Sequence, residues 1–412
     1  MTVNPFQRTI RAILPRQSTP PCYSKTSMKL PIYLDYNATT PVDPRVAKAM
    51  IPFITDHFGN ASSAHSYGYT AREAVDQARR QVASLIGARP SEIIFTGGGS
   101  ETNNLAIKGT VFAALDRNPH IVTTQTEHPA VLNTLKYLQF RFGAGCTVVP
   151  VDRTGRVSAD AIAAALRPDT VLVTVMHANN EVGTIQPIEE IARVTRAAGV
   201  LLHVDAAQST GKIPINVGSM DVDLLTLAGH KLYGPKGVGV LYRRQSVVLD
   251  PLVHGSSQES GLRAGTENVA GMVGLGAAAA IAREEDSAEP ARLRQLRDRL
   301  ETGLRAAIPG LLLNGHREHR LPNTLNVSFP GTSGQLILLS APDIAASTGS
   351  ACHSGSSDPS PVLLSMGIPR EQAAGAIRLS LGRMTTSDEI DRAGAALIKA
   401  FRSLAPAESL IG

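Results

Sequence analysis

The sequence predicts an α/β fold in which a mainly parallel sheet is covered by helices on both faces. Strand-like and helix-like segments alternate through most of residues 93–240, as they do when a helix connects each pair of parallel strands. Two of the strand-like segments, residues 200–204 and 223–227, are almost continuously apolar. This pattern is typical of strands that are buried on both faces. The chain has 412 residues, of which 43% are hydrophobic, and this is enough for sizeable cores.

A second, smaller domain is predicted in the C-terminal part of the chain. Residues 267–282 are rich in Gly and Ala, and the charged stretch at 283–307 predicts one long helix that Pro290 kinks or breaks. Residues 321–329 predict a strand of the smaller domain. We therefore expect a targeting or disordered tail at 1–30, a large domain at 31–282 and a small domain at 283–412. The first residues of the large domain can instead join the small one.

The net charge of +5 comes entirely from the N-terminal tail. The first 29 residues contain five basic residues and no acidic one, whereas the remainder has 35 of each. The high isoelectric point is therefore no argument for a nucleic-acid partner. An Arg-rich, Ser/Thr-containing and acid-free N-terminus is typical of a mitochondrial transit peptide, so we expect the mitochondrial matrix, with the cytoplasm as the alternative. No stretch reaches the apolar length of a membrane span, and we expect no membrane partner.

A carboxylate and an amine follow the ends of two predicted strands. Asp205 comes directly after the strand at 200–204, and Lys231 comes four residues after the strand at 223–227. The carboxyl ends of neighbouring parallel strands open onto one crevice, where ligands bind. Pyridoxal 5'-phosphate requires such a pair, an amine for its aldehyde and a carboxylate for its pyridine nitrogen. Either residue alone is more simply a surface or loop residue, but the pair favours this cofactor.

A glycine-rich turn predicts a phosphate site beside this pair. Gly97, Gly98, Gly99 and Ser100 stand between the strand predicted at 93–96 and the expected start of a helix. Glycines let the backbone approach a phosphate closely, and the first N–H groups of a helix favour an anion. No Gly-Lys-Ser/Thr follows, so the turn is not a Walker loop.

His128 and Asn179 follow two further predicted strands, at 121–124 and 171–175. An imidazole at a strand end can stack on a cofactor ring or move protons, and it can equally cap the helix that follows it. The amide of Asn179 can donate a hydrogen bond to the phenolic oxygen of the cofactor.

Cys352 lies in a segment, residues 346–360, that is rich in Ser and Gly and predicts an exposed loop. Free cysteines are usually buried, so we interpret Cys352 as a candidate nucleophile rather than an incidental surface thiol. Cys22 lies in the tail, and Cys146 begins a predicted strand, where we expect it in the core. No Cys/His ligand spacing is present, and we expect neither a metal site nor a disulfide.

Six motifs, taken in order, resemble those of cysteine desulfurases of the NifS/IscS type, which are class-V aminotransferase-like enzymes of pyridoxal fold type I. The motifs are Asp35-Tyr36-Asn37-Ala38-Thr39-Thr40-Pro41, the segment around His128, Asp205-Ala206-Ala207-Gln208, Gly229-His230-Lys231, Arg263-Ala264-Gly265-Thr266 and the Cys352 segment. The match spans about residues 32–402. It implies a large domain with a mainly parallel seven-stranded sheet, a smaller α+β C-terminal domain and a homodimer.

The resemblance also implies a role for each matching residue. The cofactor would be bound by Gly99, Ser100, His128, Asn179, Asp205, Gln208, His230 and Lys231, together with Thr266 from the partner subunit. Asn37 and Arg378 would bind the substrate. The catalytic residues would be Lys231, His128 and Cys352, with Cys352 taking sulfur from L-cysteine as a persulfide, leaving L-alanine and passing the sulfur to an acceptor protein.

Selenocysteine lyases share this scaffold and provide the alternative substrate, L-selenocysteine, with a selenium acceptor. Three features favour a lyase: Ala228 where many desulfurases have serine, the Cys352-His353-Ser354 start of the loop, and a chain that ends soon after residue 406. The distance from Cys352 to Pro359 favours a desulfurase. A pyridoxal transaminase or carbon–carbon lyase with an incidental cysteine is a third interpretation, which the complete cysteine segment disfavours.

Overall fold

A computed structural model describes residues 30–285, 288–349 and 358–404. The predicted transit peptide and Cys352 both lie outside these described residues. The described residues from Ile32 onward belong to one compact unit, so the division into a large and a small domain stays a prediction. No helix in the described ranges has both the length and the apolar character needed to cross a membrane.

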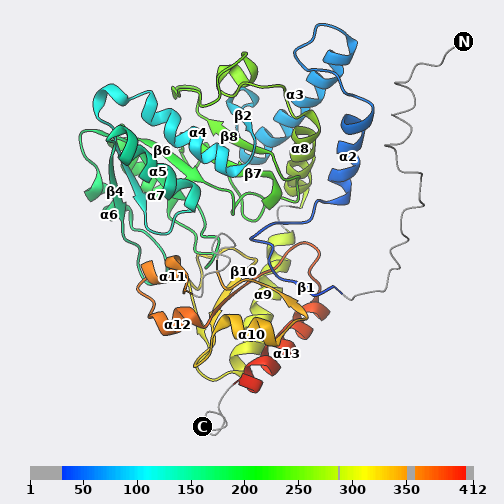
Figure 1. Cartoon of the computed structure of the whole chain (residues 1–412), viewed down its shortest axis with the longest axis vertical. Helices are drawn as coiled ribbons and strands as arrows, with labels where there is room; N and C mark the ends of the chain where they lie inside the picture. Colours follow the sequence, from blue (N-terminus) through cyan, green and yellow to red (C-terminus); the bar gives the residue numbers. More distant parts are fainter. Residues whose placement is uncertain (1–29, 286–287, 350–357, 405–412) are drawn as a thin grey trace, which may run out of the picture. The chain divides into compact units, whose positions relative to one another are not determined.

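The main structural feature is a seven-stranded sheet with the strand order β2-β8-β7-β6-β5-β3-β4 (Figure 1). Its strands are β2 (Ile93–Thr96), β3 (His120–Thr124), β4 (Gly145–Val149), β5 (Thr170–Met176), β6 (Leu201–Asp205), β7 (Leu224–Ala228) and β8 (Gly239–Arg243). Strand β8 runs antiparallel to its neighbours β2 and β7, whereas the pairs from β7 to β4 are parallel. The predicted mainly parallel seven-stranded sheet is therefore confirmed.

Helices cover both faces of this sheet because successive strand residues point to opposite sides. Ile94 and Leu172 pack in one core with α4 and α5, and Ile93 and Val173 pack in another with α3, α7 and α8. The helices of this region are α2 (Pro44–Thr55), α3 (Ser66–Ile86), α4 (Gly99–Phe112), α5 (Pro129–Phe142), α6 (Ala159–Ala165), α7 (Ile188–Ala197) and α8 (Val269–Glu284). Side chains alternate between the two faces along each strand, and those of Asp205 and Ala228 point to the face that α4 covers.

A further hydrophobic core surrounds a three-stranded antiparallel sheet with the order β12-β10-β9. Figure 1 shows α9, α10 and α13 gathered around it. Its elements are α9 (Ala288–Ala307), β9 (Leu312–Leu313), β10 (Thr324–Ser328), α10 (Gly334–Ser340), α11 (Pro361–Ser365), α12 (Arg370–Ala374), β12 (Ala376–Ser380) and α13 (Ser387–Leu404). Strand β1 (Ile32–Tyr33) pairs in parallel with β11 (Ile344–Ala345), and Ile32 and Leu34 pack in this core.

The prediction of one long helix at 283–307 is wrong at the N-terminal end of that range. Arg283 and Glu284 are the last residues of α8, and the second helix begins only at Ala288. Pro290 is the third residue of α9 and lies in its first turn. A proline costs little there, because the N–H groups of a first turn have no partner within the helix. The chain therefore breaks before the proline rather than at it.

The glycine-rich turn approaches the sheet closely because Gly239 has no side chain. A Cβ atom at Gly239 would lie 2.7 Å from the carbonyl carbon of Gly98 and 2.9 Å from the carbonyl oxygen of Leu227. Both neighbours are backbone atoms, which cannot rotate away as a side chain can. The position of the turn, and of the N-terminus of α4 that follows it, therefore depends on this glycine.

Replacing Gly239 by alanine is expected to displace the turn and to lower the free energy of unfolding by about 1–3 kcal/mol, the usual cost of overpacking. Chemical denaturation measures this loss. The matched control is Gly303→Ala in α9, where a Cβ atom meets nothing within 4 Å, so this variant should gain about 0.5–1 kcal/mol from helix propensity. Equal stability of Gly239→Ala and the unmodified chain would contradict the steric argument.

Candidate active site

A cavity of about 520 Å³ opens where the parallel strands of the large sheet end. Its volume lies within the range of about 300–1,000 Å³ that is usual for small-molecule sites. Nine of the residues predicted to form the site line it: Asn37, Gly99, Ser100, His128, Asp205, Gln208, His230, Lys231 and Arg378. The fold thus brings together residues that lie up to 341 positions apart in the sequence, from position 37 to position 378.

Asp205 is the last residue of β6 and is 6% exposed. Its Oδ2 accepts a hydrogen bond of 2.7 Å from Asn103 Nδ2, and its Oδ1 accepts one of 3.0 Å from the backbone N–H of Ala207. Asn103 was not among the predicted site residues. Its spacing from Gly99 could have identified it, because a residue four positions further along α4 lies on the same face of that helix.

Lys231 is the last residue of the short 3-10 helix η3 (Gly229–Lys231), which directly follows β7. Its Nζ donates hydrogen bonds of 2.6 Å to the carbonyl oxygens of Asn37 and Ala38. Strands β6 and β7 are paired in parallel with Asp205 opposite Thr226. Both strands therefore end at the same edge of the sheet, and the carboxylate and the amine line the same cavity.

The glycine-rich turn forms one wall of the cavity. Gly98 has a φ of 138° and provides no side-chain cap to α4, so the first N–H groups of the helix face the turn without a capping side chain. A Cβ atom at Gly99 would lie 3.2 Å from the Cβ of Ala228. The start of α4 therefore packs closely against the end of β7.

His230 lies beside the glycine-rich turn as a neutral imidazole. Its Nδ1 lies 3.1 Å from Thr39 Oγ1. Burial, assisted by the charges of Lys231, Lys236 and Lys212, lowers the pKa of His230 to about 4. At neutral pH the ring can therefore form hydrogen bonds without adding a positive charge to the cavity.

His128 caps the helix that follows it, as one of the two interpretations of its sequence position predicts, and its stacking on a cofactor ring stays a prediction. The ring caps α5, because its Nδ1 accepts a hydrogen bond of 3.0 Å from the backbone N–H of Ala130. The same ring lines the cavity. Burial is the main cause that lowers its pKa, and the charge of Lys231 acts in the same direction while Asp205 opposes it. A neutral ring can lie against an aromatic cofactor.

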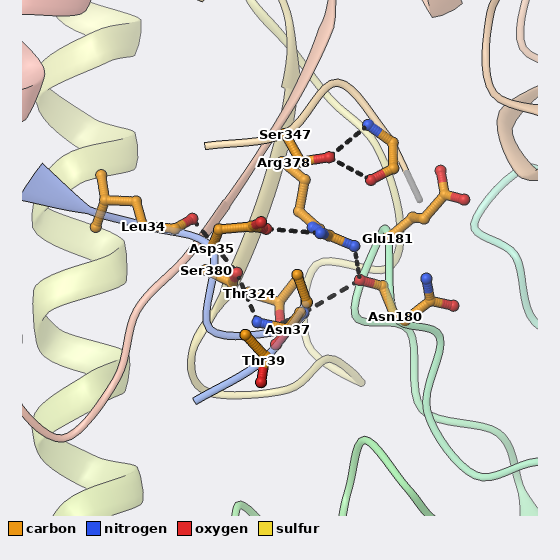
Figure 2. A network of polar contacts seen from close by, with 12 residues as sticks. Leu34, Asp35, Asn37, Thr39, Asn180, Glu181, Thr324, Ser347, Arg378 and Ser380 are labelled. Carbon is orange, nitrogen blue, oxygen red and sulfur yellow. Dashed lines mark hydrogen bonds and ion pairs between the residues drawn. The ribbon is translucent and has the colours of Figure 1, made fainter. Parts of the chain in front are cut away.

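Arg378 comes from β12 and is 1% exposed, although it lines the cavity. Figure 2 shows its guanidinium group between Asp35 and the backbone of Asn180. Its Nη2 lies 2.7 Å from Asp35 Oδ1, and its Nη1 donates a 3.0 Å hydrogen bond to the carbonyl oxygen of Asn180. Its Nε has no partner among the described residues. Its backbone also pairs with Ser347, the second residue of the segment at 346–360 that contains Cys352.

Two further buried ionisable residues were missed by the sequence analysis. Glu127 accepts hydrogen bonds through Oε1 from Thr124 Oγ1 at 2.6 Å and from the backbone N–H of Met176 at 3.0 Å. Burial raises the pKa of its carboxyl group to about 8. Lys212, which is 8% exposed, donates hydrogen bonds to Asn37 and Gln208 from behind the cavity wall. No sequence motif marks either residue.

Three predicted site residues are not brought into the cavity by the described structure. Asn179 is buried, but its Oδ1 accepts hydrogen bonds from the backbone N–H groups of Glu181 and Val182, and its Nδ2 donates one to the carbonyl oxygen of Thr126. Thr266 is exposed and does not line the cavity. Cys352 lies outside the described residues. The roles of these three residues stay predictions.

Cys146 lies in β4 and is only half-buried, so the prediction that it belongs to the core is confirmed only in part. Burial raises the pKa of its thiol to about 11, which makes it a poor nucleophile at neutral pH. The described ranges contain no group of three His, Cys, Asp or Glu residues placed to hold a metal ion.

Comparisons with known proteins agree with this geometry. Residues 32–393 match the family described as Aminotransferase class-V. The chain is 49% identical to "Cysteine desulfurase IscS" of Anaeromyxobacter dehalogenans (strain 2CP-C), over 89% of this chain and 91% of that protein. It is also 49% identical to the protein of the same name from Escherichia coli O139:H28, over 88% and 91%.

Solved structures show the same likeness. A structure named "NifS-like protein" has a TM-score of 0.85 and 40% identity, and the match covers 91% of this chain and all of that one. A structure titled "SspA in complex with cysteine" has a TM-score of 0.76 and 40% identity, with 85% and 98% of the two chains covered.

Replacing Glu127 by glutamine is expected to remove a pH-dependent loss of stability. Burial raises the pKa of this carboxyl from 4.5 to about 8, so between these values the folded chain keeps a proton that the unfolded chain releases. The free energy of unfolding then falls as the pH rises, by on the order of 1.4 kcal/mol for each unit of the pKa difference. Glutamine cannot ionise and should escape this loss.

Denaturation curves recorded from about pH 4 to pH 9 test this expectation. The advantage of Glu127→Gln over the unmodified chain should be smallest at the acidic end and largest near pH 8. Glu189→Gln, at an exposed position of α7, is the matched control and should show no such trend. Parallel curves for Glu127→Gln and the unmodified chain would contradict the buried, protonated state.

Proposed function

This chain belongs to the class-V aminotransferase family, and on that premise we propose that it is a cysteine desulfurase that uses pyridoxal 5'-phosphate. The chain is an enzyme that converts L-cysteine to L-alanine and retains the sulfur for delivery. The observation that carries this proposal is the cavity in which Asp205, Lys231 and Arg378 meet. The carboxylate and the amine suit the cofactor, and the guanidinium suits an amino-acid carboxylate.

The residues of the cavity fit the cofactor at each of its polar ends. The phosphate would lie at the N-terminus of α4, where the helix begins without a capping side chain, and would be held by Gly99, Ser100 and His230. Asp205 would face the pyridine nitrogen, and the amide of Gln208 would donate to the phenolic oxygen. Lys231 Nζ would hold the cofactor covalently. When bound, pyridoxal phosphate supplies an electron sink for the electron pair left at the substrate α-carbon.

The chain's own side chains bind the substrate and move its protons. Arg378 presents a planar fork that suits a carboxylate, and its ion pair with the half-buried Asp35 fixes the direction of that fork. Asn37 stands beside it in the cavity wall. The free amine of Lys231 is the base that takes the α-proton of the substrate. His128 would lie against the ring of the cofactor.

Cys352 completes the proposed reaction. Its thiolate attacks the sulfur of the bound amino acid, so that a sulfur–sulfur bond forms while the bond between the substrate β-carbon and its sulfur breaks. The electron pair of the broken bond remains on the β-carbon, which is protonated to give L-alanine. The sulfur stays on Cys352 as a persulfide, ready for transfer to an acceptor protein.

The homodimer, the partner and the cellular location are parts of the same proposal. Thr266 would reach the phosphate in the active site of the partner subunit, and its exposure in the single chain is compatible with this role. The basic, acid-free residues 1–29 support import into the mitochondrial matrix. A sulfur-acceptor protein would meet the enzyme at the segment that contains Cys352.

Selenocysteine lyase is the second candidate, because Ala228 lines the cavity where a serine would add a hydroxyl donor. A selenium–carbon bond is weaker than a sulfur–carbon bond, so its cleavage needs less assistance. Alanine formation from L-cysteine and from L-selenocysteine, measured side by side, separates the two functions. Comparable rates, or a preference for cysteine, are expected. A large preference for selenocysteine with almost no turnover of cysteine would replace the proposal by the lyase.

Replacing Cys352 by alanine is expected to abolish sulfide release from L-cysteine, because no thiolate remains to take the sulfur, and to leave the absorbance of the bound cofactor intact. Sulfide and absorbance are measured on the same preparation. Cys146→Ala is the matched thiol control and should retain activity, whereas Lys231→Ala should lose the absorbance of the covalently bound cofactor. Full desulfurase turnover by Cys352→Ala would overturn the nucleophile assignment.

A further inference from the structure

Lys212 is a buried lysine that stands directly behind the cavity wall and has no place in the reaction described above. It is 8% exposed and does not line the cavity. Lysine is almost never fully buried unless its amine has partners. Its position therefore requires a physical explanation.

The backbone turns at Gly211 to bring Lys212 inside. Gly211 has a φ of +73°, which is favourable only for glycine, and a Cβ atom there would collide with Leu232 Cδ1. The backbone N–H of Lys212 donates to the carbonyl oxygen of Ser209, which continues the turns that follow β6. The same short segment thus carries Gln208 in the cavity wall and Lys212 behind it.

The amine of Lys212 bridges two side-chain amides. Its Nζ donates a 2.9 Å hydrogen bond to Gln208 Oε1 and a 3.0 Å hydrogen bond to Asn37 Oδ1. Burial is the main cause that lowers the pKa of Lys212 well below its ordinary value, and the nearby charges of Lys231 and Arg378 lower it further. What Lys212 supplies to the two amides is hydrogen-bond donors.

The contact with Lys212 determines which end of the Gln208 amide is available elsewhere. The oxygen of Asn37 accepts a second hydrogen bond, of 3.1 Å, from Asn323 Nδ2. With its oxygen held by Lys212, Gln208 directs its Nε2 to the carbonyl oxygen of Asn37 at 2.9 Å, an oxygen that also accepts from Lys231. Asn37 directs its Nδ2 to Thr324 Oγ1 and to the carbonyl oxygen of Asn180. Rotating either amide by half a turn would place N–H groups against the amine and lose a buried hydrogen bond.

We propose that Lys212 is a positioning residue that fixes the amides of Gln208 and Asn37, so that Gln208 offers an N–H donor, not an oxygen, to the phenolic oxygen of the bound cofactor. This inference rests on the proposed function. It explains why a buried amine with two amide oxygens as partners lies next to the cavity. It also assigns a role to a residue that touches neither cofactor nor substrate.

The test is the pH at which the visible absorbance of the bound cofactor titrates, compared between the unmodified enzyme and Lys212→Met. Methionine keeps an unbranched apolar chain and removes the donor. A phenolate that loses an N–H donor holds its proton to higher pH, so the titration should shift upward by about one pH unit, as expected for one hydrogen bond to a charged oxygen. Lys136→Met, at an exposed position of α5, should show no shift.

A double-mutant comparison shows whether Lys212 acts through Gln208. Gln208→Leu alone should shift the titration in the same direction, and adding Lys212→Met to it should cause little further shift, because the group that Lys212 positions is already absent. Additive shifts would overturn the positioning role. If Lys212→Met does not fold, Lys212→Gln, whose amide keeps a donor one bond shorter, must shift the titration upward by a smaller amount.

The possible failures are distinguishable. If the unmodified protein binds no pyridoxal phosphate, both the proposed function and the role of Lys212 are overturned. If it binds the cofactor and forms alanine while Lys212→Met, or Lys212→Gln in its place, titrates at the unmodified pH, only the role of Lys212 is overturned. A shift confined to the Lys212 and Gln208 variants supports the inference.

Discussion

The parallel pairing of β6 with β7 determines where the chemistry of this protein takes place. Because Asp205 lies opposite Thr226, the two strands end at the same edge, and the η3 turn that follows β7 places Lys231 in the cavity with Asp205. A shift of one residue in this pairing would turn the side chains of one strand to the opposite face of the sheet. The carboxylate would then lose Asn103 and the glycine-rich turn of α4, so the cofactor site depends on this register.

The substrate end of the cavity depends instead on Asn37, whose hydrogen bonds link the smaller sheet to the turn that follows the larger one. The backbone N–H of Asn37 donates to Ser380 Oγ in β12, its Nδ2 donates to Thr324 Oγ1 in β10, and its carbonyl oxygen accepts from Lys231. Buried polar networks of this kind stabilise one arrangement when every group has a partner and are costly when one is lost. Asn37 therefore holds Arg378, which comes from the smaller sheet, in a fixed relation to Lys231, which comes after the larger one.

The sequence predicts the parts of this site that follow from local patterns and misses those that arise from tertiary packing. Asp205, Lys231 and Gly99 could be found because strand ends and a glycine-rich turn mark them. Asn103 could have been found by helical spacing from Gly99. Glu127 and Lys212 could not, because what makes them unusual is burial, and burial depends on segments distant in the sequence. Pro290 shows the same limit, because a proline in a first turn and one inside a helix look alike until the start of the helix is known.

Burial also leaves two ionisable groups of the site without charge at neutral pH. Desolvation raises the pKa of Glu127 to about 8 and lowers that of His230 to about 4. Neutral buried groups act as fixed dipoles, which need no reorganisation when charge develops nearby. Their contribution therefore depends on orientation, which is what the hydrogen bond from Lys212 to the Gln208 amide would set.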